Sequence, residues 1–219
     1  MIFGAKVTSY TMPADDVVAN GPEELVAYCA RVSSGRPKET WGEEYEGLLK
    51  YCIRNSHWSV FEMVDATVEI NGPRDILRQI LRHRSFSFQE LSQRYSSGIA
   101  FTAREVRSQD NKNRQNSIDD MSEELQEQFK RDCELIAALG DLYYKQWIAR
   151  GAAKECARVF LPEGLTMSSM QMKGSLRSWL HYLKVRDDEG VTQWEHVQIA
   201  REVAKVLTPV FPTIFKLET

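Results

Sequence analysis

Residues 63–84, MVDATVEINGPRDILRQILRHR, contain two different hydrophobic periods in succession, and this change decides the fold class. In residues 63–71 every second residue is apolar, which predicts a strand with one buried face; these residues are Val64, Ala66, Val68 and Ile70. Residues 71–73, Asn-Gly-Pro, favour a turn that places Pro73 at the start of a helix. Apolar residues then recur at helical spacing over residues 74–84.

The flanking segments predict more helix than strand. Residues 3–10 are β-branched and aromatic enough for a strand, and residues 166–172 fit either a strand or an irregular link. Residues 33–37 and 108–116 have loop composition. Helices are predicted from Gly21 to Val32 and over residues 43–55, 118–150, 152–160, 174–185 and 192–208. Without an alternating β-α-β order, these elements predict an α+β fold.

Composition limits the class of protein. The chain has 219 residues, 42% hydrophobic residues and a formal net charge of −3. One domain spanning residues 1–219 is favoured over two small ones. An acidic balance disfavours a general nucleic-acid binder. No apolar run approaches the roughly 20 residues that span a bilayer, and the first residues lack signal-peptide features, so we expect a cytoplasmic protein without membrane contact.

Cysteine and histidine spacings give no indication of a metal site. The cysteines are Cys29, Cys52, Cys133 and Cys156, and none forms a C-x-x-C pair. Each lies among apolar neighbours in a predicted helix, so we expect buried, reduced thiols. No H-E-x-x-H motif is present, and no metal site is expected. The glycine-rich phosphate-binding motifs are also absent.

Arginine is concentrated between residues 74 and 94. This stretch has five arginines and only two acidic residues. The first three arginines, Arg74, Arg78 and Arg82, recur every fourth residue and would share one helix face. The planar guanidinium binds phosphate oxygens in pairs, which indicates an anionic ligand. Residues 87–90 also form an S-x-x-E capping box, which predicts a helical turn near residue 88. The alternative is a helix end whose arginines pair with acidic side chains elsewhere.

Three further groups of polar residues stand out. His57, Ser59 and Glu62 interrupt the apolar segment HWSVFE, either as site residues or as a helix cap and a core histidine. Arg177 and His181 are spaced to share a helix face, with Arg186 further along. Each of these residues, and Arg158 in ARVFLP, also fits an ordinary surface or core position.

The order Arg82-His83-Arg84, seven residues, then Ser92 resembles the signature of the flavin-dependent thymidylate synthases. Three more segments resemble that family in the same order: HWSVFE, ARVFLP, and SLRSWLHYLKVR followed by TQWE. The resemblance implies conversion of dUMP to dTMP, with methylenetetrahydrofolate as methylene donor and FAD carrying hydride from NADPH. It also implies a central antiparallel sheet flanked by helices, in a homotetramer with active sites between subunits.

The resemblance assigns roles to individual residues. Arg186 and Ser92 would be catalytic, and Arg186 would help to ionise the uracil ring. The dUMP-binding set would be Gln79, Arg82, Glu90, Ser92, Gln93, Arg94, Arg158 and Arg186. The FAD-binding set would be His57, Ser59, Arg82, His83, Arg84, Glu90, Ser175, Arg177 and His181.

Three positions depart from the family's usual residues. Gln89 and Ser175 stand where asparagine is common, and Met63 stands where a histidine often follows the glutamate. Ser175 is shorter than asparagine and offers fewer hydrogen bonds to a flavin. Two alternative functions stay open from the residues: a cysteine-dependent thymidylate synthase, and a non-catalytic module that binds nucleic acid or phosphate. No cysteine has an electropositive local sequence, so we expect no cysteine nucleophile.

Overall fold

A four-stranded antiparallel sheet is the centre of the computed structural model, which describes residues 3–41, 44–96 and 98–216. Its strand order is β1-β2-β6-β3. The strands are β1 (Gly4–Tyr10), β2 (Asp65–Pro73), β6 (Met167–Ser175) and β3 (Ser87–Glu90). A separate two-stranded hairpin consists of β4 (Ser108–Gln109) and β5 (Ser117–Ile118). The α+β class and the antiparallel sheet are therefore confirmed.

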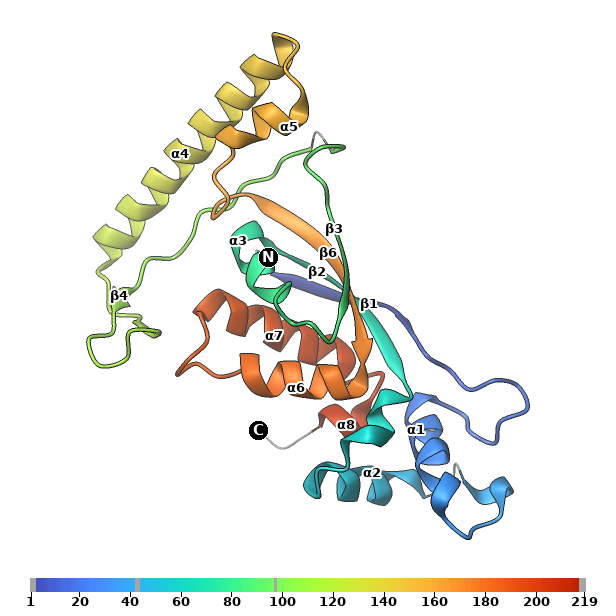
Figure 1. The fold of residues 1–219 in the computed structure, drawn as a ribbon. Helices are drawn as coiled ribbons and strands as arrows, with labels where there is room; N and C mark the ends of the chain where they lie inside the picture. Colours follow the sequence, from blue (N-terminus) through green and yellow to red (C-terminus); the bar gives the residue numbers. More distant parts are fainter. Residues whose placement is uncertain (1–2, 42–43, 97, 217–219) are drawn as a thin grey trace.

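Helices lie around this sheet (Figure 1). The α-helices are α1 (Pro22–Ala30), α2 (Tyr45–Arg54), α3 (Arg74–Ile80), α4 (Glu123–Ala149), α5 (Lys154–Ala157), α6 (Leu176–Arg186), α7 (Trp194–Leu207) and α8 (Pro212–Phe215). Short 3-10 helices are η1 (Arg31–Ser33), η2 (Lys38–Thr40), η3 (Trp58–Glu62) and η4 (Arg158–Phe160). Helices α6 and α7 lie side by side, and α7 packs on β1 and β2. Among the described residues no helix is both long and apolar enough to cross a membrane.

The main core lies between the sheet and the helices packed on it. Alternation in β2 is confirmed, because Ala66, Val68 and Ile70 are buried. Trp179 of α6 is completely buried, and its indole N–H donates to the Ala66 carbonyl at 3.1 Å. This bond satisfies a buried polar group while the indole ring fills the core. It also fixes α6, and the polar residues on that helix, relative to β2.

Helix α4 extends away from the sheet and has a small core of its own (Figure 1). This core contains Tyr144, Ala157 and Leu161. Gly140 permits the close packing, because a Cβ there would lie 2.7 Å from the Phe160 carbonyl oxygen. Many apolar side chains of α4 and η4 are exposed: Leu125, Phe129, Leu135, Ile136, Leu139, Leu142, Tyr143, Trp147, Val159 and Phe160.

Three local predictions around the arginine stretch were wrong. Residues 71–73 are not a turn but the end of β2, because they pair with residues 167–169 of β6. Pro73 has no N–H to donate, and a strand tolerates it because it is the last residue. Residues 87–90 are strand β3, paired with residues 170–173, so the capping box forms no helical turn. The helix predicted to residue 84 ends at Ile80.

Two other predictions need correction. Residues 108–116 were expected to be a loop, but residues 108–109 form β4 and pair with residues 117–118 of β5. All four cysteines are free, and Cys52 and Cys133 are buried as expected. Cys29 is only partly buried, and Cys156 is exposed because α5 has a single turn that packs mainly through Ala157. The open alternative at 166–172 is decided in favour of a strand, β6.

We expect Gly174→Ala to destabilise the protein, because the new methyl group would lie 2.5 Å from the Phe86 ring. That ring is packed edge-on against Trp179 at 4.7 Å and has little room to move. Overpacking of this kind costs about 1–3 kcal/mol. Urea unfolding measures the change. Gly47→Ala, at an exposed position of helix α2, is the matched control and should be neutral or stabilising, since a Cβ there meets nothing within 4 Å. Equal stability of the two variants would contradict the packing argument.

Candidate active site

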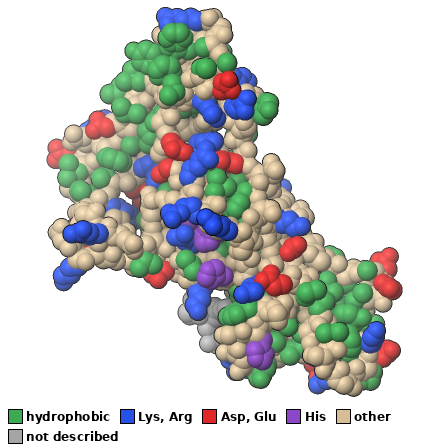
Figure 2. Space-filling model, viewed as in Figure 1, with side chains coloured by type: hydrophobic (Ala, Val, Ile, Leu, Met, Phe, Trp, Pro, Cys, Tyr) green, Lys and Arg blue, Asp and Glu red, His purple; other side chains and the backbone are tan. Residues whose placement is uncertain are grey.

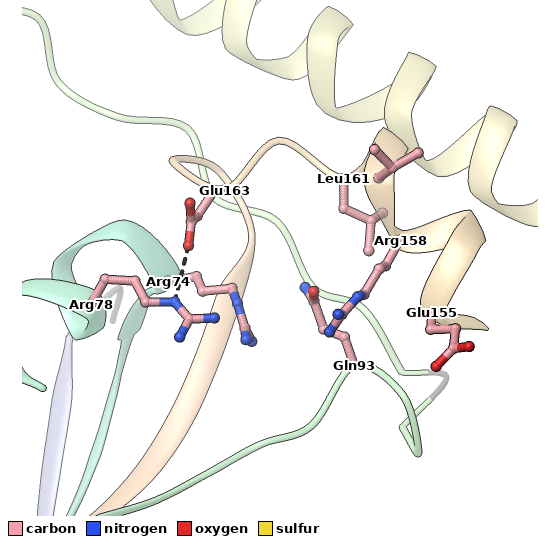
Figure 3. A pocket seen from close by; sticks show the side chains of 8 residues that line it. Arg74, Arg78, Gln93, Glu155, Arg158, Leu161 and Glu163 are labelled. Atoms are coloured by element: carbon pink, nitrogen blue, oxygen red, sulfur yellow. Dashed lines mark hydrogen bonds and ion pairs between the residues drawn. The ribbon is translucent and has the colours of Figure 1, made fainter. Parts of the chain in front are cut away.

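A cavity of about 410 Å³ opens between α3 and the segment formed by α5 and η4. Figure 3 shows side chains from both sides converging on it. The lining residues are Arg74, Arg78, Gln93, Glu155, Arg158, Val159, Leu161 and Glu163. Three guanidinium groups in one small cavity make it suitable for an anion.

Arg74, which lines this cavity, is held in place by Glu90. Arg74 is buried, and its Nη1 lies 3.2 Å from Glu90 Oε1. Burial lowers the pKa of Arg74, while the Glu90 carboxylate opposes that effect. The Ser168 hydroxyl donates to the same Glu90 oxygen at 3.1 Å. A buried charge pair with an added hydrogen bond holds both side chains in one geometry.

The outer arginines are held more loosely. Arg78 Nε donates to Glu163 Oε1 at 3.1 Å, the contact drawn in Figure 3. Arg94 Nη2 lies 3.1 Å from Glu155 Oε2. Each of these four side chains is roughly half exposed, and exposed ion pairs contribute only about 0.2–1 kcal/mol. A phosphate group with more charge than one carboxylate could therefore displace either glutamate.

Arg158 differs from its neighbours because it forms no ion pair with any residue in the described part of the chain. It begins η4 and reaches across the cavity toward Gln93 (Figure 3). Ser92 precedes Gln93, and its hydroxyl oxygen accepts the Arg94 N–H at 3.2 Å. The Ser92 hydroxyl proton is therefore available for another acceptor. Arg158 is the guanidinium best prepared for a new anion.

A second cluster lies at the end of α6. Arg186 Nε donates to His83 Nε2 at 2.9 Å. The His83 ring packs edge-on against Tyr182 at 5.1 Å, and the Tyr182 hydroxyl lies 3.2 Å from Nε2 of buried His196. Burial, together with Arg186 and His181, lowers the pKa of His83 to about 4. Burial likewise lowers the pKa of His196 to about 3, so both rings are neutral near pH 7.

A third cluster joins η3 to the start of α6. The Ser175 hydroxyl donates to Glu62 Oε2 at 2.6 Å, and Arg177 Nη1 donates to Glu62 Oε1 at 2.9 Å. Ser175 is also the N-cap of α6, because its oxygen accepts the Ser178 N–H. Ser175 is therefore held by the fold itself, and its shorter side chain has a structural partner in Glu62.

The sequence relates the chain to known proteins. The family model described as thymidylate synthase complementing protein matches residues 16–213. A flavin-dependent thymidylate synthase of Synechocystis is 47% identical over 210 residues, which cover 94% of either chain. A probable flavin-dependent thymidylate synthase of Paramecium bursaria Chlorella virus 1 is 42% identical and covers 97% of each. The chain belongs to the flavin-dependent thymidylate synthase family.

The fold agrees with this membership of the flavin-dependent thymidylate synthase family. The crystal structure of a UMP/dUMP methylase from Streptomyces cacaoi, bound with 5-Br dUMP, superposes with a TM-score of 0.81. The match covers 98% of this chain and 93% of that one, at 24% sequence identity. It shows a shared fold.

In this member of the flavin-dependent thymidylate synthase family, the predicted residues fall into separate groups. Gln93, Arg94, Arg158 and Glu90 lie at or beside the cavity. Gln79 lies on the far end of α3 and donates to Gln193 at 2.7 Å. Within the single chain, Arg186 and His83 form a pair distinct from the cavity lining. One chain therefore contributes several partial groups rather than one closed pocket.

The remaining predicted residues lie mainly on the surface. His57 is exposed and packs edge-on against Tyr51 at 5.6 Å. Arg82 and Arg84 are exposed, and neither pairs with a carboxylate among the residues that the structure describes. Figure 2 shows basic and histidine side chains gathered near the middle of the face, around the segment between α3 and β3. Ser59 and His181 are also exposed.

Sequence reasoning did not assign several residues of these groups. Arg74 and Arg78 share a predicted helix face, and their four-residue spacing is the signal that the sequence offers for them. Glu155 and Glu163 gave no local signal, because their partners Arg94 and Arg78 lie far away along the chain. The Tyr182–His196 pair was also missed, since each residue alone fits a core position.

Proposed function

We propose that this protein methylates dUMP to dTMP, with methylenetetrahydrofolate as the one-carbon donor and NADPH as the source of hydride. Family membership gives the reaction class. The observation that carries the assignment is the arginine-lined cavity of about 410 Å³, where Arg158 forms no ion pair with a described residue and can take an anionic ligand. The same membership favours this function over a non-catalytic phosphate-binding module.

The nucleotide phosphate would bind in this cavity. Arg158 and Arg94 would supply charge-assisted hydrogen bonds, while Gln93 and the Ser92 hydroxyl would supply neutral ones. Glu90, held by Arg74, offers a fixed acceptor for a sugar hydroxyl. Gln79 and Arg82 complete the nucleotide-binding set that we propose.

Arg186 would act on the pyrimidine ring. C5 of uracil is a weak nucleophile in the neutral ring. A permanent guanidinium beside N3 and O2 stabilises the ring anion, and that anion carries more electron density on C5. Ser92 is the second proposed catalytic residue, because its hydroxyl proton is available to a ring or sugar oxygen.

The residues fit a flavin dinucleotide. Its two phosphates need cationic donors, and Arg82, Arg84 and Arg177 present exposed guanidinium groups. His57, Ser59, His83, Glu90, Ser175 and His181 complete the proposed FAD-binding set. A bound flavin supplies hydride transfer, and the protein supplies orientation and charge. Ser175 is held by Glu62, so the backbone at the start of α6 is fixed before a ligand arrives.

A homotetramer with active sites between subunits fits the surface of the chain. The exposed apolar side chains of α4 and η4 form a large surface, and exposure of such a surface to water is unfavourable. Burial of this surface against copies of the same chain would also bring separate groups of site residues together. Such an assembly would complete a site whose groups lie apart within one chain, such as the Arg186–His83 pair and the cavity lining.

The purified protein tests the proposed function directly. We expect a flavin absorbance spectrum, and release of dTMP when dUMP, methylenetetrahydrofolate and NADPH are supplied together. Omission of any one of these three should abolish dTMP formation. A colourless protein that takes up no added FAD and forms no dTMP would overturn the proposal.

We expect Glu155→Gln to tighten dUMP binding. The carboxylate holds Arg94 in an exposed ion pair, and its loss frees Arg94 for the phosphate. Since exposed pairs contribute about 0.2–1 kcal/mol, the gain in affinity should be roughly 1.5- to 5-fold. Calorimetric titration with dUMP measures it. Glu127→Gln on the exposed side of α4 is the control for loss of negative charge and should leave the affinity unchanged.

We expect Cys156→Ala to retain methyl transfer. Cys156 matters most among the four cysteines because it is exposed, and a nucleophilic thiol must be reachable. Burial raises the pKa of Cys29 and of Cys52, which disfavours their thiolates. Alanine variants of Cys29, Cys52 and Cys133 should also keep activity when rates are divided by the folded, flavin-loaded fraction. Loss of all activity in a folded cysteine variant would indicate covalent catalysis.

A further inference from the structure

Within the described residues, the side-chain hydrogen-bond partner of Arg186 is a histidine and not a carboxylate. The Arg186 Nε–H donates to the His83 ring nitrogen Nε2 at 2.9 Å. No carboxylate forms an ion pair with Arg186 anywhere in residues 3–41, 44–96 and 98–216. The charge of Arg186 acts on His83, Tyr182 and His196, while Asp187, the next residue, forms its ion pair with Arg201. The positive charge of Arg186 is therefore not cancelled from within the described chain.

His83 is itself held from several sides. Its ring packs edge-on against Tyr182 of α6 at 5.1 Å, against Phe86 at 6.4 Å and against His196 of α7 at 6.4 Å. These three neighbours are buried. His83 lies in the segment between α3 and β3, and its ring presents Nε2 to Arg186 from a position packed against these three side chains. A fixed acceptor of this kind restricts the orientation of a long side chain.

We propose that His83 is a positioning residue for Arg186: its Nε2 accepts the Nε–H, so that the two terminal nitrogens of the guanidinium are oriented toward the ionised pyrimidine ring. This proposal rests on the proposed function, and adds to it a role for His83 besides flavin contact. A carboxylate in the same place would also orient Arg186, but would cancel part of the charge that stabilises the ring anion. Neutral imidazole orients the fork and leaves its charge available.

The charge states agree with this role. Burial is the largest cause of the lowered pKa of His83, and Arg186 and His181 add to it. With its pKa at about 4, the ring is neutral and accepts a hydrogen bond throughout the pH range where the enzyme is assayed. Burial also raises the pKa of Tyr182, so this hydroxyl stays protonated and adds no negative charge near Arg186.

Substitution of His83 separates positioning from simple packing. In His83→Gln the side-chain oxygen lies as many bonds from Cβ as the histidine Nε2 does, so it can accept the same hydrogen bond. In His83→Asn the side chain is polar but too short, and His83→Leu has no acceptor. Lys184→Gln, an exposed residue on the same helix, controls for loss of charge from α6.

The readout is the ionisation of a bound nucleotide, measured on flavin-loaded protein by ultraviolet difference spectra across pH. The probe is 5-fluoro-dUMP, whose fluorine makes N3–H more acidic. In the wild type and in His83→Gln the midpoint of ionisation should lie below that of the free nucleotide. In His83→Asn and His83→Leu the preference for the ionised ring should fall about tenfold, which moves the midpoint about one pH unit toward the free value.

The outcomes are distinguishable. An unchanged midpoint in His83→Asn or His83→Leu, with the probe bound, overturns the positioning role. Loss of the midpoint shift in His83→Gln as well would also overturn it, since the acceptor is then irrelevant. An unshifted midpoint in the wild type would instead refute the action of Arg186 on the ring, and failure of the wild type to bind the probe would refute the proposed function.

Discussion

Arg186→Lys is expected to lower kcat by about 10²- to 10³-fold while flavin content is retained. Lysine keeps the positive charge but loses the planar fork, and it cannot keep the contact from Nε to His83. Loss of one well-placed donor to a developing negative charge typically has an effect of this size. Single-turnover rates of flavin-loaded protein, with dUMP saturating, measure the chemical step separately from binding.

Lys184→Arg, on the same helix and exposed, is the matched control and should turn over at the wild-type rate. Dissociation constants for dUMP should change much less than kcat in Arg186→Lys, because the proposed phosphate-binding residues are untouched. Full activity of Arg186→Lys would show that another group stabilises the ring anion. A parallel loss of flavin would instead assign Arg186 to cofactor binding.

Arg158→Ala is expected to weaken dUMP binding by roughly ten- to a hundredfold. A charge-assisted hydrogen bond is worth about 1.5–3 kcal/mol, and Arg158 gives up no ion pair of the described chain when a phosphate binds. Arg94→Ala should have a smaller effect, since the Arg94 contact with the phosphate replaces an existing contact with Glu155. Calorimetric titration with dUMP ranks the two variants.

Arg150→Ala provides the control for that series. Arg150 lies at the end of α4 and stacks over Trp147 at 5.2 Å, away from the cavity lining. Its removal should leave both dUMP affinity and flavin content unchanged. If Arg150→Ala weakens dUMP binding as much as Arg158→Ala does, then long-range charge and not the cavity determines affinity.

The sequence predicted the elements whose signals are local. Alternation in residues 64–70 predicted the main part of β2, and helical periodicity predicted α6 and α7 to within a few residues. It failed where a distant strand decides the structure. Asn71-Gly72-Pro73 has turn composition, yet pairing with residues 167–169 keeps it extended. Ser87 and Glu90 have capping-box spacing, yet pairing with β6 makes them a strand.

In the candidate site, too, contacts between residues far apart along the chain could not be predicted from the sequence. The family resemblance assigned Arg158 and Gln93 to the nucleotide-binding set, and both line the cavity. The alternative that the arginines pair with acidic side chains elsewhere also holds for Arg74 and Arg78, which contact Glu90 and Glu163. Their partners come from other elements, so no spacing within the helix reveals them. Electrostatic pairing depends on the tertiary fold, whereas a motif depends only on sequence order.

The position of β6 in the sheet has a consequence for how the chain folds. This strand pairs with β2 on one side and β3 on the other, and its first and last residues, Met167 and Ser175, pair with Pro73 and Asp65. On the ribosome, β1 and β2 emerge long before this partner is synthesised. Contacts between such distant segments slow folding, since a long loop must close before they form. Until residue 175 has emerged, β2 and β3 each keep an unpaired backbone edge, which a chaperone or another nascent chain can bind.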